Sequence, residues 1–213
     1  MSSPAPLCPG LNCPICPRLV AYRQKNRAAY PNRHNAPVPP FGTLDSALLI
    51  VGLAPGLQGA NFTGRPFTGD WAGDLLYATL IDYGWAHGVY QERADDGLTL
   101  MNCRITNAVK CVPPENKPTG DEISNCLPFL KNEIAAMNNL KVILSLGLVS
   151  HNAVLKALGQ KASAYKFAHG AMHHIGDVLL IDSYHCSRYN TNTGRLTERM
   201  FRDVFDHIQT YLT

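Results

Sequence analysis

Four short apolar runs divide the chain and predict buried β-strands. They cover residues 47–53 (ALLIVGL), 99–105 (TLMNCRI), 142–146 (VILSL) and 178–181 (VLLI). Most of them are apolar almost without interruption, which is typical of strands buried on both faces of a parallel sheet. The pattern therefore favours a sheet enclosed between layers of helices.

Helical patterns lie between and around these runs. They cover about 18–30, 73–83, 121–137, 150–158 and 196–212, and Thr119 or Asp121 can cap the third of them. Strands that alternate with helices predict one α/β domain with a central, mostly parallel sheet. We expect this single domain to span residues 1–213.

Composition limits the possible classes of protein. At 213 residues and 46% hydrophobic content the chain can bury one full core, and no apolar run approaches the roughly 20 residues of a membrane span. The start, MSSPAPLCPG, lacks the features of a signal peptide, and seven cysteines without such a signal indicate a reducing compartment. We expect a cytoplasmic monomer without a membrane partner. The net charge of +3 permits nucleic acid as a partner.

Four of the seven cysteines form two separated pairs. Cys13 and Cys16 form a C-x2-C pair, and Cys111 and Cys126 form a C-x14-C pair. Four soft thiolates select zinc or an iron–sulfur cluster, so we expect a metal centre that clips the Cys-rich segment 1–40 onto the body. The alternative is a set of buried or paired cysteines without a metal.

The segment that follows is strongly basic. Residues 18–30 carry Arg18, Arg23, Lys25 and Arg27, and Arg33 lies just beyond. A helix here presents a basic face, which is either solvated or directed at phosphates.

Polar and Gly-rich loops follow three of the expected strands, at residues 52–70, 106–120 and 183–194. Ligands of open α/β sheets bind at the carboxyl ends of the strands, so these loops should converge on one site. The first loop has neither the G-x-G-x-x-G pattern nor the G-K-[ST] of phosphate-binding loops. His185 is a lone histidine just after an expected strand. Such a histidine is more often structural, but the polar residues around His185 favour a functional role.

Several motifs in these loops together resemble the uracil-DNA glycosylase superfamily. They are GLAPG, FTGD, ITNAVKC and H-x-S-x-x-N-T-x-T-G-R-L, in that order, within residues 13–196. The resemblance is closest to the type-5 branch, the iron–sulfur-containing enzymes of bacteria and archaea. It implies a four-stranded parallel sheet flanked by helices, a [4Fe–4S] cluster, and removal of uracil and some other damaged bases from DNA in base-excision repair. It also implies that the cluster ligands are Cys13, Cys16, Cys111 and Cys126, with Cys8 as a possible substitute in the first pair.

Hydrolysis of an N-glycosidic bond builds negative charge on the leaving base, which must first be flipped out of the duplex. His185 is the natural donor to the base oxygen, Asn107 can pair with a pyrimidine edge or position water, and Phe67 can stack on the base, unless it is an ordinary core aromatic. The full base-binding set expected is Gly52, Ala54, Gly56, Phe67, Asn107 and His185. The expected DNA contacts are Ser187, Arg188, Tyr189 and Asn190, with Tyr189 as a wedge.

The chain departs from the better-known branches of the superfamily at three positions. Ala54 stands where those branches carry a carboxylate that positions the attacking water, and type-5 members share this absence. Asn61 and Asp70 are the remaining candidates for holding the water, although Asp70 can equally be a helix N-cap. Cys186 stands where a proline usually follows the motif histidine, which puts the rigidity of that loop in doubt. Gly56 stands where uracil-restricted relatives carry a bulky aromatic, which predicts a roomier pocket.

The leading hypothesis is therefore a monofunctional DNA glycosylase, a hydrolase of N-glycosyl bonds. The competing hypothesis is a non-catalytic module that binds damaged DNA with the same fold and cluster, supported by the missing carboxylate and the altered histidine motif. A third, more remote one is an α/β enzyme acting on nucleotides, with zinc on the same cysteines.

Overall fold

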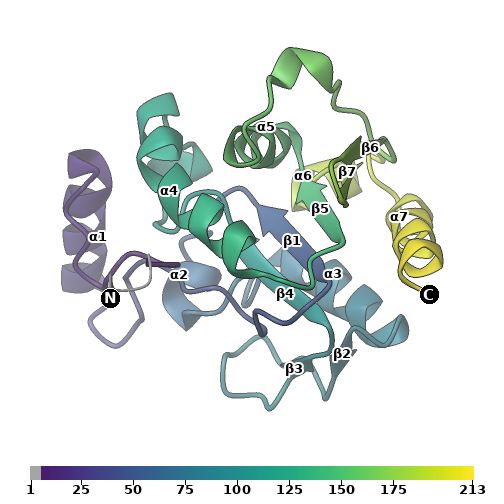
Figure 1. Cartoon of the computed structure of the whole chain (residues 1–213). Helices are drawn as coiled ribbons and strands as arrows, with labels where there is room; N and C mark the ends of the chain where they lie inside the picture. The colour runs from purple at the N-terminus through teal and green to yellow at the C-terminus, as the bar shows by residue number, and fades with distance from the viewer. Residues whose placement is uncertain (1–5) are drawn as a thin grey trace.

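A five-stranded sheet forms the centre of the molecule, in the order β4-β1-β5-β7-β6 (Figure 1). The computed structural model describes residues 6–213. The strands are β1 (Leu48–Gly52), β4 (Cys103–Asn107), β5 (Val142–Leu146), β6 (Met172–Ile175) and β7 (Val178–Ser183). β4, β1, β5 and β7 run parallel, and β6 pairs antiparallel with β7. The predicted α/β fold with a mostly parallel sheet is thus confirmed, and the four parallel strands gain a fifth, antiparallel one.

Two features of the strands differ from the sequence prediction. β6 has the polar sequence MHHI with one buried residue, Ile175, so it carries no apolar run. The run 99–105 is divided, because Asn102 adopts a left-handed φ of 49°. Its first part, β3 (Thr99–Leu100), pairs instead with β2 (Ala86–His87) in a separate ribbon.

The five predicted helices are present, with ends that differ by only a few residues. They are α1 (Pro17–Ala29), α3 (Trp71–Asp82), α4 (Gly120–Ala136), α5 (Leu148–Ala157) and α7 (Glu198–Leu212). Thr119 caps α4 in a capping box with Glu122. Three short elements lie within the expected loops: α2 (Ala60–Thr63), α6 (Arg188–Asn192) and the 3₁₀ turn η1 (Pro114–Asn116). A second 3₁₀ turn, η2 (Ala162–Ala164), lies between α5 and β6.

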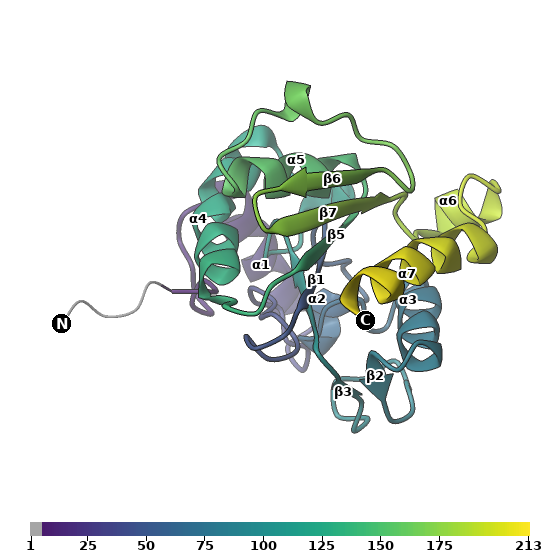
Figure 2. The same ribbon diagram turned by 45° about the vertical axis from the view of Figure 1, so that its right-hand side comes forward.

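The helices cover both faces of the sheet (Figure 2). Leu48 and Ile50 of β1 belong to the core formed with α3 and α7, whereas Leu49 and Val51 belong to the core formed with α4 and α5. Burial on both faces explains why β1 is apolar at every position before Gly52. No helix within residues 6–213 is long and apolar enough to cross a membrane.

One lateral edge of the sheet is covered by the chain that leads into it. Phe41 forms an isolated antiparallel bridge with Ile105 of β4, with backbone N–H···O distances of 2.9 and 2.8 Å. Further along, the Val38 N–H donates to the Lys110 carbonyl at 2.7 Å. The N-terminal segment is therefore attached along β4 before the first strand begins.

The basic residues of α1 mainly attach the helix to the body. Arg18 forms an ion pair of 2.7 Å with Glu122, and the buried Arg23 donates to the Cys13 carbonyl at 2.8 Å. Arg27 donates to the backbone of Leu11 and Asn35. Arg18, Arg23 and Arg27 thus hold the helix in place, whereas Lys25 and Arg33 of the expected basic face remain exposed.

Candidate active site and cysteine-lined cavity

A cleft of ≈ 460 Å³ opens at the carboxyl end of the parallel strands. Residues 53–72 form one wall, Asn107 at the end of β4 lies at its base, and residues 185–189 after β7 form the opposite wall. Asn116 from the second loop also lines it. The three polar loops therefore converge on one site, as their positions in the sequence predict.

Asn107 presents an unpaired acceptor in this cleft. Its side chain is almost fully buried, and its Oδ1 has no hydrogen-bond partner among the described residues. Leaving a buried acceptor unpaired costs about 1–3 kcal/mol. Such an atom is suited to accept an N–H from a molecule bound in the cleft.

Phe67 lies beside Asn107, and Gly52 makes room for both. The Phe67 ring is 6% exposed, lines the cleft and has a left-handed φ of 52°. A Cβ at Gly52 would lie 2.5 Å from Phe67 Cζ and still closer to Asn107 Oδ1. Tyr90 holds the Phe67 loop, because its hydroxyl donates to the Phe67 carbonyl at 3.2 Å. Phe67 is thus a buried aromatic that also presents a surface to the cleft.

His185 faces the cleft next to the Phe67 ring, with ring centroids 5.9 Å apart and an interplanar angle of 29°. Burial lowers the pKa of His185 to about 4, so its imidazole is neutral at pH 7 and keeps one N–H donor. Asn190 fixes the loop, since its Nδ2 donates to the His185 carbonyl at 2.8 Å. Cys186 is fully buried, and its thiol donates to the Ala72 carbonyl at 3.4 Å, which anchors the position where relatives carry proline.

Asp70 is the N-cap of α3 and also lines the cleft. Its Oδ1 accepts from the Gly73 N–H at 3.2 Å. Burial raises the pKa of its carboxyl. Its Oδ2 would lie 3.3 Å from a Cβ at Gly56, which lines the cleft without a side chain.

Asn61, the other candidate for holding water, does not line the cleft. It is buried, and its Nδ2 donates to Asn35 Oδ1 at 2.8 Å. Asn190 also differs from the expected DNA contact, because its amide is turned inward to His185. Both asparagines therefore stabilise loops, which their sequence context does not indicate.

The mouth of the cleft carries Ser187, Arg188 and Tyr189, as expected for a DNA-facing rim. Tyr189 is 72% exposed, and the Arg188 guanidinium lies 5.4 Å from the centre of the Trp71 ring. Trp71, which the sequence analysis did not single out, also lines the cleft and donates from Nε1 to Thr191 Oγ1 at 2.9 Å. Its position directly after the FTGD motif was the available signal.

A second cavity brings the four predicted cysteine ligands together. Cys13, Cys16, Cys111 and Cys126 line it. The Lys110 N–H lies 3.3 Å from Cys126 Sγ, which is the kind of donor that stabilises a metal-bound thiolate. The substitute ligand Cys8 does not line this cavity, and its thiol faces the Val38 carbonyl at 3.9 Å.

The spacing of these sulfurs bears on the kind of metal. In the described part of the chain, no three cysteine sulfurs lie within 4.8 Å of one another. Four thiolates around one zinc ion, at about 2.3 Å each, lie only about 3.8 Å apart. Four thiols around one cavity, an N–H directed at Cys126 Sγ, and the apolar Leu19 and Val109 in the lining are the donor set and surroundings of a thiolate-bound metal centre.

Comparison with known proteins gives one consistent result. The model of the uracil DNA glycosylase superfamily matches residues 39–209. A type-5 uracil-DNA glycosylase of Thermus thermophilus is 42% identical over 198 residues, which cover 90% of each chain. The type-5 enzyme of Pyrobaculum aerophilum is 40% identical over 198 residues, covering 91% of this chain and 86% of its own. A type-4 uracil-DNA glycosylase from the latter organism is 36% identical over 152 residues, 71% of this chain and 63% of its own.

Proposed function

Because the chain belongs to the uracil-DNA glycosylase superfamily, we propose that it hydrolyses the N-glycosidic bond of uracil in DNA, as a monofunctional enzyme of base-excision repair. Water adds to C1′ of the deoxyribose while the bond to the base breaks, which leaves an abasic site and free uracil. The observation that carries the proposal is the unpaired Asn107 Oδ1 in a cleft that also holds Phe67 and a neutral His185.

Asn107 supplies the recognition of the base. Uracil presents an N3–H donor between two carbonyl oxygens, so Asn107 Oδ1 accepts from N3 and its Nδ2 donates to O4. Cytosine has no hydrogen on N3 and carries an amino group at C4, so it opposes both contacts. Phe67 stacks on the flipped base, and the absence of a side chain at Gly56 leaves space for bases beyond uracil, such as hypoxanthine or etheno adducts.

His185 and Asp70 act on the two sides of the breaking bond. The His185 N–H donates to O2 of the leaving base, where negative charge develops, and one such preorganised donor is worth about 10²–10³ in rate. Asp70 holds the attacking water, because it reaches the cleft and Asn61 does not. Its place at the N-terminus of α3 fixes the carboxylate that performs this step.

DNA binds across the mouth of the cleft. Arg188 and Ser187 contact the backbone beside the flipped nucleotide, and the exposed Tyr189 enters the gap that the base leaves in the duplex. Trp71 adds an exposed aromatic surface next to Arg188. The flipped base thus enters the cleft past the aromatic side chains of Trp71 and Tyr189 and the basic side chain of Arg188.

The cavity of Cys13, Cys16, Cys111 and Cys126 holds a [4Fe–4S] cluster in this proposal. The cluster supplies a cross-link between the N-terminal segment and the body of the domain, and the proposed hydrolysis requires no electron transfer. All seven cysteines are free of disulfides, which suits a reducing compartment such as the cytoplasm. We also propose that the enzyme acts as a monomer, since one chain supplies every part of the cleft.

The test is incubation with duplex DNA that carries a single uracil, followed by alkali to cleave abasic sites. Wild type should cleave at uracil and leave a matched cytosine duplex intact, because cytosine opposes both contacts of Asn107. Asn107→Ala should lose cleavage, whereas Asn138→Ala, an exposed asparagine just after α4, should retain it. Specific binding to uracil DNA without any alkali-labile product would favour the non-catalytic module instead.

A further inference from the structure

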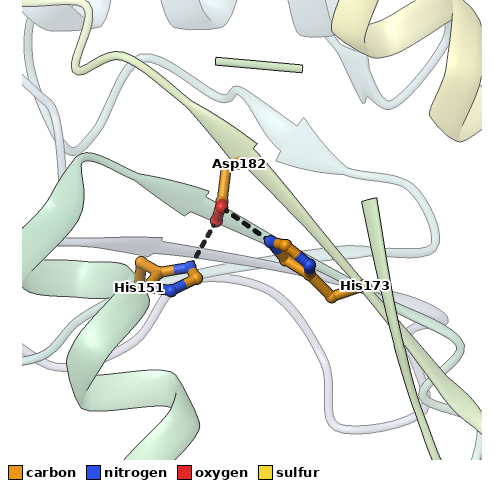
Figure 3. A group of neighbouring side chains, drawn as sticks. All are labelled: His151, His173 and Asp182. Carbon is orange, nitrogen blue, oxygen red and sulfur yellow. Dashed lines mark hydrogen bonds and ion pairs between the residues drawn. The ribbon is translucent and has the colours of Figure 1, made fainter. Parts of the chain in front are cut away.

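A group of three metal-binding side chains lies apart from both the cleft and the cysteine cavity. His151 from α5, His173 from β6 and Asp182 from β7 converge, with the carboxylate between the two imidazoles (Figure 3). Their donor atoms all lie within 4.8 Å of one another. The proposed glycosylase reaction uses none of the three.

The contacts of His151 are compatible with a cation bound beside Asp182. Its Nε2 lies 3.0 Å from the Tyr165 carbonyl, and because a carbonyl only accepts, Nε2 carries the proton. Its Nδ1 lies 2.8 Å from Asp182 Oδ1. In a neutral imidazole with this tautomer, the Nδ1 lone pair would point directly at a carboxylate oxygen. Either a second proton or a metal ion must lie between them.

The spacing of the donor atoms is close to that of a metal site. His173 Nε2 lies 3.2 Å from Asp182 Oδ2. A tetrahedral zinc with ligands at about 2.0–2.1 Å separates its donor atoms by about 3.3–3.4 Å. The 2.8 Å between His151 Nδ1 and Asp182 Oδ1 is shorter, so an ion requires these two atoms to separate by about 0.5 Å. Two histidines and one carboxylate form a common donor set for zinc and iron(II).

The surroundings also resemble the outer shell of a metal site. Ligating histidines commonly donate their second N–H to a backbone carbonyl, as His151 does to Tyr165. Ligating carboxylates are themselves hydrogen-bonded, and Ser145 Oγ donates to Asp182 Oδ1 at 2.6 Å. His151 and Asp182 are 1% and 0% exposed, but the His173 side chain is 15% exposed, which gives an ion a route in.

From these contacts we propose that His151, His173 and Asp182 form a binding site for a divalent transition metal, with zinc as the probe. The ion lies between the two imidazoles and the Asp182 carboxylate and leaves a coordination position for water. It joins α5 and the edge strand β6 to β7, the strand that leads directly into His185. The proposal is independent of the glycosylase activity. The role of the ion is to hold this part of the sheet together.

The experiment titrates the holoprotein, with its cysteine centre loaded, with Zn²⁺ by calorimetry and with Co²⁺ by visible absorption. Wild type should bind one equivalent, and Zn²⁺ should raise its melting temperature. The Co²⁺ spectrum should lack a sulfur charge-transfer band, because the ligands are nitrogen and oxygen. His173→Gln should weaken binding at least about tenfold. The matched control is His174→Gln, the exposed neighbour on β6 whose ring lies near Tyr211, and it should bind as wild type does.

Three results would overturn the proposal. The first is wild-type protein that binds no Zn²⁺ up to about a thousandfold molar excess, which would leave a protonated histidine–aspartate network. The second is equal affinity of wild type and His173→Gln. The third is a sulfur-to-cobalt band for the bound ion, which would place it on the cysteines. His173 is the preferred position for the variant because it is the least buried of the three residues, and its folding can be verified by circular dichroism.

Discussion

Gly52→Ala should damage the base-binding site by adding one methyl group. Gly52 ends β1, and its φ lies outside the left-handed region, so alanine can adopt the same backbone conformation. The perturbation is therefore purely steric. The new Cβ would lie 2.5 Å from Phe67 Cζ and closer still to Asn107 Oδ1.

The size of the effect follows from these distances. Carbon atoms in favourable contact are about 3.5 Å apart or more. The Phe67 ring must therefore move by about 1 Å, and Asn107 by a similar amount. A misplacement of about 1 Å can lower a catalytic rate about 10²-fold, and overpacking of a core costs about 1–3 kcal/mol of stability. We expect a rate loss of about 10²-fold in a protein that still folds.

The assay is the single-turnover rate of uracil excision, measured well below the melting temperature of the variant. Gly120→Ala is the matched control, because its Cβ would meet no atom within 4 Å and Gly120 lies outside the cleft. This control should stay within a few-fold of wild type. A Gly52→Ala rate within threefold of wild type would refute the reasoning, since the base could then not depend on Asn107 and Phe67 in the observed arrangement.

Four further predictions concern His185, the cysteine cavity and the DNA-facing rim. His185→Ala should lower the excision rate about 10²–10³-fold with little change in DNA affinity, and an unchanged rate would exclude His185 as the donor. Burial lowers the pKa of His185 to about 4, so as the pH falls the unfolded chain binds a proton on this residue before the folded chain does. The free energy of unfolding of wild type, relative to that of His185→Gln, should therefore fall as the pH is lowered from about 6.5 to about 4. A difference between the two proteins that does not depend on pH would contradict this. Cys111→Ser should lose iron and visible absorption, whereas Cys8→Ser, outside the cavity, should keep both by metal analysis. Arg188→Ala should reduce the slope of log affinity against log salt by about one, and an unchanged slope would remove Arg188 from the phosphate contacts.

The sheet could be predicted because its central strands are buried on both faces and so are apolar at nearly every position. β1, β5 and β7 carry this signal, and their predicted bounds agree with the structure to within two residues at either end. β6 could not be found in this way, because an edge strand with the sequence MHHI needs few apolar residues. The division of the run 99–105 depends on the local backbone conformation of Asn102, which composition does not reveal.

The motifs predicted which residues gather at the cleft but not what each one contacts. His185, Phe67 and Asn107 meet there as expected. Asn61 and Asn190 instead hold other parts of their loops, because their partners come from tertiary packing. The group of His151, His173 and Asp182 has no regular spacing in sequence, so only the folded chain brings it together.

The bridge between Phe41 and Ile105 also affects how the protein behaves at high concentration. An open strand edge exposes unpaired N–H and C=O groups that can recruit a second chain into a continuous sheet. Here the incoming N-terminal segment bonds to the middle of β4 and so blocks that edge. The opposite edge strand, β6, is only four residues long, which limits edge-to-edge pairing. Both lateral edges of the sheet are thus protected against pairing with a second chain, which supports the proposed monomer. The same protection predicts good solubility at the concentrations that crystallisation requires.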